Sequence, residues 1–282
     1  MKQTVINLYD YFHLEKPAHA KGTLTCLVQE ISEEFCPNRN FPAMLVIPGG
    51  GYSFVSDREA LPIAYQFLAK GYSAFILDYA VAPAMFPTAL REAALAMRYI
   101  RENAEELHIR ADRVAAIGFS AGGHLCGSLS TMYNCPELES FASPEQARPD
   151  AAALCYPVLL SWGPTHEGTM RNISGGDQAL RERLSLEKQV HAGMPPVFLW
   201  HTRDDASVPA RNSLIMACAL EQAGLPFVLH IYRSGQHGLS MADETVYRKD
   251  TMPAVISADS LQWMPTLHCW LKEQDFIPED GV

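Results

Sequence analysis

The chain has 282 residues, of which 48% are hydrophobic and 19% are charged, a composition that excludes a disordered chain or a coiled coil. Its formal net charge of −10 at pH 7 argues against a nucleic-acid partner or an anionic membrane surface, because both attract basic proteins. No stretch of the sequence approaches the run of about 18 apolar residues that a membrane-spanning helix needs.

The N-terminal stretch carries Asp10, Glu15 and Lys16 where a secretion signal would need an apolar run, so no signal peptide is predicted. Seven cysteines are scattered without CxxC spacing. Their odd number and apolar neighbours predict reduced, mostly buried thiols and no zinc site. We therefore expect a cytoplasmic protein that carries no metal.

Short apolar runs alternate with segments of helical periodicity along most of the chain. Apolar positions at helical spacing predict helices over 60–68, over 90–100 after Pro87, over 215–219 before Gly224, and over 261–271. The runs have the length and composition of strands buried on both faces, and they cover 43–47, 73–77, 114–117, 152–156, 197–200 and 227–232. This alternation predicts βαβ units and a mostly parallel sheet.

The sequence contains no repeat, linker-like run or break in composition, so a single domain over residues 1–282 is predicted. The stretch 161–194 is less regular and rich in glycine. Because it lies between two predicted strands, it is the best place for a small inserted segment that faces the substrate. The oligomeric state stays open.

The most informative motif is G-x-S-x-G at 118–122, which follows a predicted strand and opens a helical segment. A serine on a sharp strand-to-helix turn occupies strained backbone, and glycines two residues to either side relieve the crowding. The turn places Ser120 at a helix N-terminus, where negative charge is stabilised. Ser120 is therefore the candidate nucleophile, the alternative being a structural serine in a glycine-rich turn.

A second glycine motif follows the predicted strand 43–47, at Gly49, Gly50 and Gly51. Adjacent glycines let bare backbone N–H groups approach a substrate oxygen, and acyl transfer needs two such donors at the tetrahedral oxyanion. We assign the donors to Gly50 or Gly51 and to Ala121. A phosphate-binding loop is the alternative, but the chain lacks G-x-G-x-x-G and GK[ST].

A nucleophilic serine needs a base, and a carboxylate must orient that base. His237 lies in a glycine-flanked loop after the predicted strand 227–232 and is the candidate base. His124, one helical turn after Ser120, is expected to pack in the core, His201 to be structural, and the pair at 166–167 to lie in a solvated loop.

Asp205 is the candidate acid because it follows the predicted strand 197–200. Its neighbour Asp204 is expected to face solvent or to cap the next helix. Asp78 is a poor candidate because it precedes the serine. The order Ser120, Asp205, His237 is that of sheet-based serine hydrolases.

The chain resembles α/β-hydrolases of the carboxylesterase and acetyl-esterase type, close to bacterial proteins described as acetyl xylan esterase-like or xylanase-B-like. The resemblance rests on PGGGY at 48–52, DYAVAP at 78–83, GFSAGGHL at 118–125, SLEKQV at 185–190, PPVFLWHTRDDASVP at 195–209 and SGQHGLS at 234–240. Many relatives carry a histidine before the glycines, where this chain has Pro48, so the anchoring of the loop is expected to differ.

The resemblance implies a mostly parallel, doubly wound sheet of about eight strands with helices on both faces. It also implies a Ser120–Asp205–His237 triad without metal or cofactor, and an oxyanion hole at Gly50, Gly51 and Ala121. The expected activity is hydrolysis of small-molecule esters.

Small residues at 121–123 and the lack of a long apolar lid favour a short acyl group, above all acetyl, on a sugar or an oligosaccharide. An arylformamidase, amidase or peptidase on the same fold remains open, as does a non-catalytic ligand-binding relative.

Overall fold

The computed structural model describes residues 1–34, 38–243, 245–247 and 257–277. Eight strands in these residues form one sheet. They are β1 (Lys2–Asn7), β2 (Thr23–Val28), β3 (Phe41–Ile47), β4 (Ser73–Asp78), β5 (Ile109–Phe119), β6 (Ala151–Cys155), β7 (Val197–Thr202) and β8 (Phe227–Tyr232). The six predicted strands correspond to β3–β8, and the count agrees with the eight implied by the resemblance.

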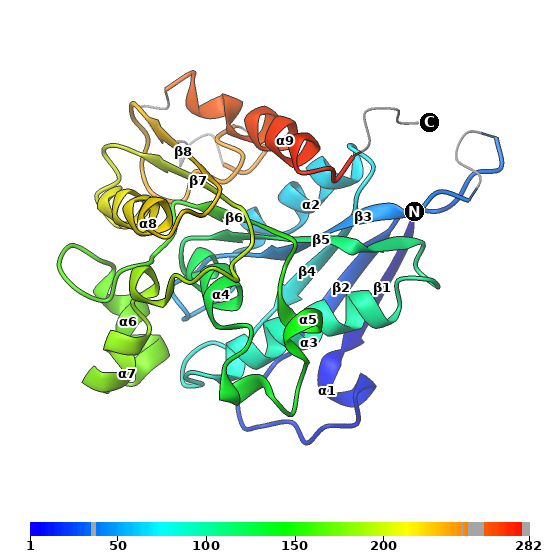
Figure 1. The fold of residues 1–282 in the computed structure, drawn as a ribbon, viewed down its shortest axis with the longest axis horizontal. Coiled ribbons are helices and arrows are strands. Elements are labelled where there is room, and N and C mark those ends of the chain that lie inside the picture. The colour runs from blue at the N-terminus through cyan, green and yellow to red at the C-terminus, as the bar shows by residue number, and fades with distance from the viewer. Residues whose placement is uncertain (35–37, 244, 248–256, 278–282) are drawn as a thin grey trace.

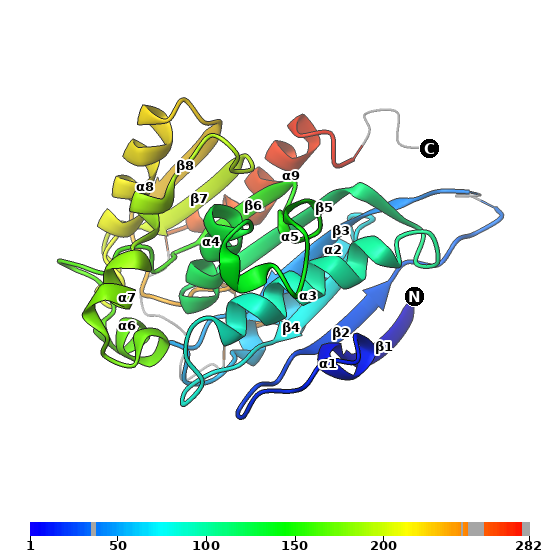
Figure 2. The ribbon, with the colours of Figure 1, turned by 60° about the horizontal axis from the view of Figure 1, so that its bottom comes forward.

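The strands lie in the order β1-β2-β4-β3-β5-β6-β7-β8, which Figure 2 shows running from one edge of the sheet to the other. Strands β3 to β8 are parallel, whereas β2 runs antiparallel to both β1 and β4. Because the chain returns through a helix after most parallel strands, the loops that follow β3, β5, β7 and β8 all emerge at the same edge.

Helices cover both faces of the sheet (Figure 1). They are α1 (Leu8–Tyr11), α2 (Leu61–Leu68), α3 (Thr88–Glu102), α4 (Ala121–Met132), α5 (Pro144–Ala147), α6 (Glu167–Ser174), α7 (Gln178–Arg183), α8 (Arg211–Gln222) and α9 (Trp263–Glu273). Short 3₁₀ turns occupy Asp57–Glu59, Pro136–Leu138, Leu186–Gln189 and Ser260–Gln262.

Two buried clusters fill the space between the sheet and its helices. Alternate residues of β3 divide between them: Leu45 belongs to the cluster that contains residues of α3, α4 and α8, and Met44 to the cluster that contains residues of α2 and α9. This alternation follows from the two-residue period of a strand. It explains why the predicted strands are apolar at nearly every position.

The predicted helices are confirmed as α2, α3, α8 and α9, with one difference. Leu261 lies in the 3₁₀ turn before α9 and is exposed, so that helix begins two residues later than its apolar spacing predicts. Of the cysteines, Cys26, Cys126, Cys135 and Cys155 are buried free thiols, Cys218 and Cys269 are exposed, and Cys36 lies outside the described residues.

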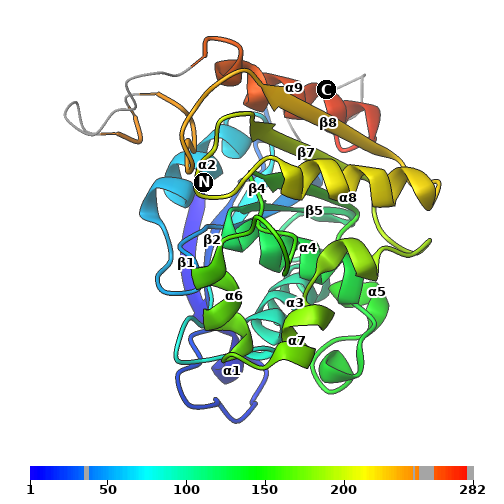
Figure 3. The same ribbon diagram turned by 90° about the vertical axis from the view of Figure 1, so that its left-hand side faces the viewer.

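The predicted irregular stretch 161–194 contains α6, α7 and the turn Leu186–Gln189. Helices α6 and α7 lie side by side (Figure 3). Asn172 of α6 donates a hydrogen bond to the carbonyl oxygen of Gly51, at 2.8 Å, so this stretch contacts the glycine loop. In the described part of the chain, no helix has both the length and the apolar character needed to cross a membrane.

Candidate active site

The predicted site residues come together at the edge of the sheet where the parallel strands end. The glycine loop follows β3, Ser120 follows β5, Asp205 lies three residues after β7, and His237 lies five residues after β8. The carboxyl ends of parallel strands form the usual ligand-binding edge of a doubly wound sheet. Residues separated by up to 188 positions in the chain are therefore close in space.

Ser120 occupies the sharp turn that its motif predicts. Its backbone has φ 53° and ψ −115°, directly before α4, a conformation that non-glycine residues rarely adopt. A methyl group on Gly118 would lie 2.2 Å from the carbonyl oxygen of Gly122, and one on Gly122 would lie 2.2 Å from that of Ile47. Both glycines are therefore required for the turn to pack against β3.

A continuous chain of hydrogen bonds links the serine, the histidine and the aspartate. The Oγ of Ser120 lies 2.7 Å from Nε2 of His237, and Nδ1 of His237 lies 2.7 Å from Oδ2 of Asp205. An ionised carboxylate only accepts hydrogen bonds, so Nδ1 carries the proton that is donated to Asp205. The free Nε2 of His237 then accepts the hydroxyl proton of Ser120, which is the arrangement that proton removal requires.

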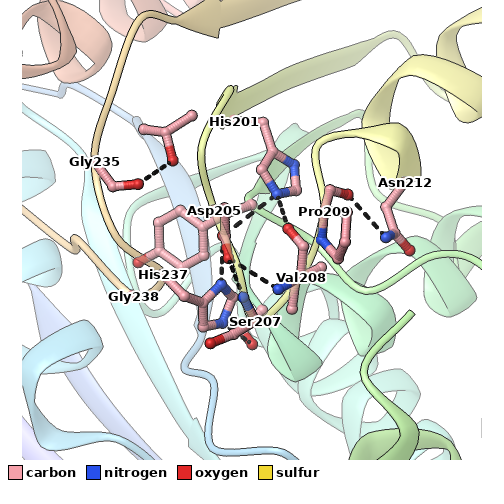
Figure 4. A network of polar contacts seen from close by, with 12 residues as sticks. His201, Asp205, Ser207, Val208, Pro209, Asn212, Gly235, His237 and Gly238 are labelled. Carbon is pink, nitrogen blue, oxygen red and sulfur yellow. Dashed lines mark hydrogen bonds and ion pairs between the residues drawn. The ribbon is translucent and has the colours of Figure 1, made fainter. Parts of the chain in front are cut away.

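Asp205 is held ionised by its surroundings (Figure 4). Burial raises the pKa of this carboxyl. The histidine donors His201 and His237, with the N–H of Val208, outweigh burial and hold the pKa well below its usual range. Oδ1 accepts backbone N–H groups from Ser207 at 3.0 Å and Val208 at 2.9 Å. The carboxylate is thereby fixed in position as well as in charge.

The glycine loop presents free donors beside the serine. Gly50 has φ 129° and Gly51 has φ 64°, and a methyl group on Gly50 would lie 2.0 Å from the carbonyl oxygen of Phe54, so only glycine fits there. Within the described residues, the backbone N–H groups of Gly50, Gly51 and Ala121 donate no hydrogen bond. These three groups are available for a substrate oxygen.

The loop is anchored without the histidine that many relatives carry. The hydroxyl of Tyr79 donates to the carbonyl oxygen of Pro48 at 2.7 Å. The N–H of Gly49 donates to Oε2 of Glu59 at 2.8 Å. Two side chains from other segments therefore hold Pro48 and Gly49, which directly precede the predicted oxyanion donors.

Sequence reasoning missed the role of Glu59 and Tyr156. Glu59 is buried, and its Oε1 accepts the hydroxyl of Tyr156 at 2.7 Å. The Tyr156 oxygen in turn accepts the N–H of Ser240 at 2.9 Å, and its ring meets that of His237 edge-on at 5.3 Å between centroids. Glu59 therefore joins the glycine loop to the histidine loop. No local motif marks either residue, because the contacts join segments distant in sequence.

The pair at 166–167 was predicted to lie in a solvated loop, and this holds only in part: Glu167 is exposed but begins α6, and His166 is the N-cap of that helix. It is half-buried and lines a cavity of about 250 Å³ together with Gly50, Gly51, Ser120 and His237. Its Nδ1 lies 3.2 Å from the N–H of Thr169 and 2.7 Å from the Thr169 hydroxyl, so it caps α6. Burial, and then repulsion from His237 when that ring is protonated, lower the pKa of His166.

The remaining candidates have structural surroundings. His124 is buried between the Tyr52 hydroxyl and the Leu184 carbonyl, and burial lowers its pKa to about 4. Asp78 is ion-paired with Lys21. His201 is buried as expected, but its Nε2 also lies 3.5 Å from Asp205, so it supports the acid.

Asp204 is exposed, as one of its two predicted roles requires, but it does not cap α8. Its Oδ1 instead accepts the N–H of Gly235 at 2.7 Å. The carbonyl oxygen of Gly235 accepts the Thr202 hydroxyl at 2.7 Å (Figure 4). The end of β7 thus anchors the loop that carries His237.

The small residues after the serine do not shape the acyl site in the way that the sequence suggests. Gly122 packs on the backbone of Ile47 and Pro48, and Gly123 packs on Pro157. Neither lines the cavity at Ser120. Their small size serves the packing of α4 against the end of β3 and against Pro157 after β6. Any limit on the size of the acyl group is therefore set by the residues that line the cavity.

Comparison with known proteins identifies the family. Residues 35–220, more than half of the chain, match the family model BD-FAE. The chain belongs to the BD-FAE family. The predicted resemblance to acetyl-esterase-like α/β-hydrolases is confirmed by this match and by the relatives that follow.

Endo-1,4-beta-xylanase B of Butyrivibrio fibrisolvens is 35% identical over 215 residues, which are 72% of this chain and 33% of that protein. Acetylxylan esterase of Xylanibacter ruminicola is 27% identical over 279 residues, which are 96% of this chain and 52% of that protein. This BD-FAE chain therefore spans a third to about half of the length of these two curated relatives.

Among solved structures, the acetyl ester-xyloside bifunctional hydrolase from Caldicellulosiruptor lactoaceticus has a TM-score of 0.81 and 34% identity. The match covers 98% of this chain and 97% of that one. The α/β-hydrolase fold predicted for the chain is thereby confirmed over nearly its full length.

Proposed function

We propose that this chain is a serine esterase that removes short acyl groups, above all acetyl, from acetylated sugars. The observation that carries the proposal is the hydrogen-bonded chain from Ser120 through His237 to Asp205, with 2.7 Å at both steps. The cavity of about 250 Å³ beside Ser120 lies below the range of about 300–1,000 Å³ found for sites that hold larger ligands, which supports a small acyl group. Two similar proteins, an acetylxylan esterase and an acetyl ester-xyloside bifunctional hydrolase, support ester and xyloside substrates.

The proposed mechanism uses the same polar groups in both half-reactions. His237 takes the proton from Ser120 as the serine oxygen attacks the ester carbonyl. The N–H groups of Gly50 or Gly51 and of Ala121 hold the negative oxygen of the tetrahedral intermediate. The C–O bond to the alcohol breaks, and the alcohol leaves with the proton from His237.

Water then releases the acyl group by the same route. His237 removes a proton from the water that attacks the acyl-enzyme, and returns that proton to the Ser120 oxygen as the acid leaves. Asp205 keeps the imidazole in the tautomer with Nδ1 protonated throughout.

The test compares hydrolysis of p-nitrophenyl acetate, butyrate and octanoate by the wild type and by Ser120→Ala. Ser128→Ala is a matched control, because Ser128 lies on the same helix and its buried hydroxyl has no partner among the described residues. We expect fast acetate hydrolysis that Ser128→Ala keeps and Ser120→Ala loses by about 10³-fold or more. Activity that survives Ser120→Ala would overturn the assignment of the nucleophile.

Two further comparisons separate the rival functions. Faster cleavage of an aryl amide or formamide than of the matching ester would replace the esterase proposal by an amidase. A folded wild type that cleaves neither class would indicate a ligand-binding protein. Asp205→Asn is expected to lower kcat by about 10⁴-fold by stabilising the wrong tautomer, whereas Asp204→Asn keeps an acceptor oxygen for the Gly235 N–H and is expected to leave kcat near the wild-type value.

A further inference from the structure

A second cavity, of about 600 Å³, lies beside the catalytic cavity. Gln3 of β1, Thr25 of β2 and Ile76 of β4 belong to its lining, together with Leu61 at the start of α2. Thr25 is paired with Val5 and with Ile76 across the antiparallel strands, so these residues share one face of the sheet.

This face of the sheet is open because the covering helix does not reach its edge. Helix α2 packs on β3 and β4, whereas β1 and β2 lie beyond them at the edge of the sheet (Figure 2). Val5, on the same face as Thr25, is 60% exposed. The two antiparallel strands thus form a shelf next to the catalytic edge.

One turn of the chain separates the two cavities. Ser53 and Phe54 line both of them. The backbone N–H groups of these two residues donate to the carbonyl oxygen of Gly50, at 3.0 and 3.2 Å. The segment that presents the proposed oxyanion donors is therefore also a wall of the second cavity, so the two cavities adjoin at Ser53 and Phe54.

The chemistry of the second cavity suits a neutral ligand with many hydroxyl groups. Its charged lining groups are Lys21, Asp57 and Asp78, and Lys21 is ion-paired with Asp78 at 2.7 Å. The remaining carboxylate disfavours an anion. Phe54 is 60% exposed and offers a flat apolar face, and the polar side chains around it supply hydrogen-bond donors and acceptors.

We propose that the second cavity binds the alcohol side of the ester, which is one or more neutral sugar rings of an acetylated oligosaccharide. The ring of Phe54 packs against the apolar face of a sugar, and the polar groups of β1, β2 and β4 receive its hydroxyls. This inference rests on the proposed esterase function. The difference in size between the two cavities matches a small acyl group joined to a larger alcohol.

The test uses a substitution that fills the second cavity at a residue that does not line the catalytic cavity. Thr25→Trp places bulk in the second cavity. Thr4→Trp is the matched control, because Thr4 is exposed on the opposite face of β1, where it pairs with Cys26. The measured quantity is the ratio of kcat/KM for acetylated xylotriose to kcat/KM for p-nitrophenyl acetate. We expect Thr25→Trp to lower this ratio by about 10-fold or more and Thr4→Trp to leave it at the wild-type value.

A binding experiment separates this inference from the esterase proposal. Xylotriose is titrated into Ser120→Ala by calorimetry, which needs no catalysis, with and without Phe54→Ala or Thr25→Trp in the same chain. We expect each additional change to weaken binding by about 10-fold. Equal binding in all variants that remain folded by thermal unfolding, or no binding at all, would overturn the sugar site even if Ser120 proves to be the nucleophile. If Thr25→Trp instead lowers octanoate relative to acetate hydrolysis, the cavity holds the acyl chain and the inference is wrong.

Discussion

Replacing Gly122 by alanine tests the packing that places Ser120 beside the glycine loop. The added methyl group would lie 2.2 Å from the carbonyl oxygen of Ile47 and 2.3 Å from that of Pro48. Both are backbone atoms, one at the end of β3 and one at the start of the loop that carries the proposed oxyanion donors. The contact must open from 2.2 Å to an ordinary 3.4 Å, so helix α4 and the loop separate by about 1.2 Å.

A displacement of this size acts on catalysis more than on stability. Misplacing reacting groups by about 1 Å costs on the order of 100-fold in rate, so we expect kcat/KM for p-nitrophenyl acetate to fall by about that factor in Gly122→Ala. Overpacking costs roughly 1–3 kcal/mol, of which the higher helix propensity of alanine returns about 0.5–1 kcal/mol. The protein therefore stays folded, which urea unfolding checks.

Gly127→Ala is the matched control on the same helix. Its methyl group would meet Cδ1 of Leu186 at 2.8 Å, and this atom is the end of a flexible side chain that can rotate away. We expect this variant to keep the wild-type kcat/KM. If Gly122→Ala keeps kcat/KM within about twofold of the wild type, the contact between α4 and the glycine loop does not position the site as argued.

Two further predictions concern buried carboxylates. Glu59→Leu leaves the N–H of Gly49 and the hydroxyl of Tyr156 without their acceptor, so we expect the free energy of unfolding to fall by roughly 2–6 kcal/mol and kcat to fall with little change in KM. Glu59→Gln keeps one acceptor oxygen, so both effects should be smaller. An unaltered kcat in a folded Glu59→Leu variant would refute this. Burial raises the pKa of Glu92 from 4.5 to about 7, against the opposing effect of its hydrogen-bond donors. The folded state therefore favours the neutral carboxyl, and about 3 kcal/mol of stability is lost as the pH rises from 4.5 to about 7. Urea unfolding at several pH values should show the free energy of unfolding of the wild type falling by that amount relative to Glu92→Gln. A difference between the two proteins that does not change with pH would contradict this.

The elements predicted from the sequence are those with a local signal. Strands β3–β8 are covered on both faces and therefore read as short apolar runs. The edge strand β1 and its neighbour β2 escaped detection, because an edge strand need not be apolar and the Thr residues of β2 alternate with its core positions.

The residues of the candidate site also divide into those with a local sequence signal and those without one. The Ser120 turn was predictable because its strained backbone requires glycines at fixed offsets, and His237 and Asp205 because each follows a strand at the edge where parallel strands end. Glu59, Tyr156 and His166 carry no such signal. Their positions result from contacts between segments far apart in the chain, such as the hydrogen bond from Tyr156 to Glu59 across 97 positions.

The sequence alone therefore determined the class of fold, the order of β3–β8 along the chain and the three residues proposed for catalysis. The tertiary structure alone decided what surrounds them: the carboxylate of Glu59 that joins two loops, the imidazole of His166 at the cavity wall, and the open shelf on β1 and β2. The physical reason is the separation along the chain over which each interaction acts. Backbone strain and hydrophobic periodicity act between neighbours in the chain and leave a pattern there, whereas a buried hydrogen bond or a cavity depends on segments that only folding brings together.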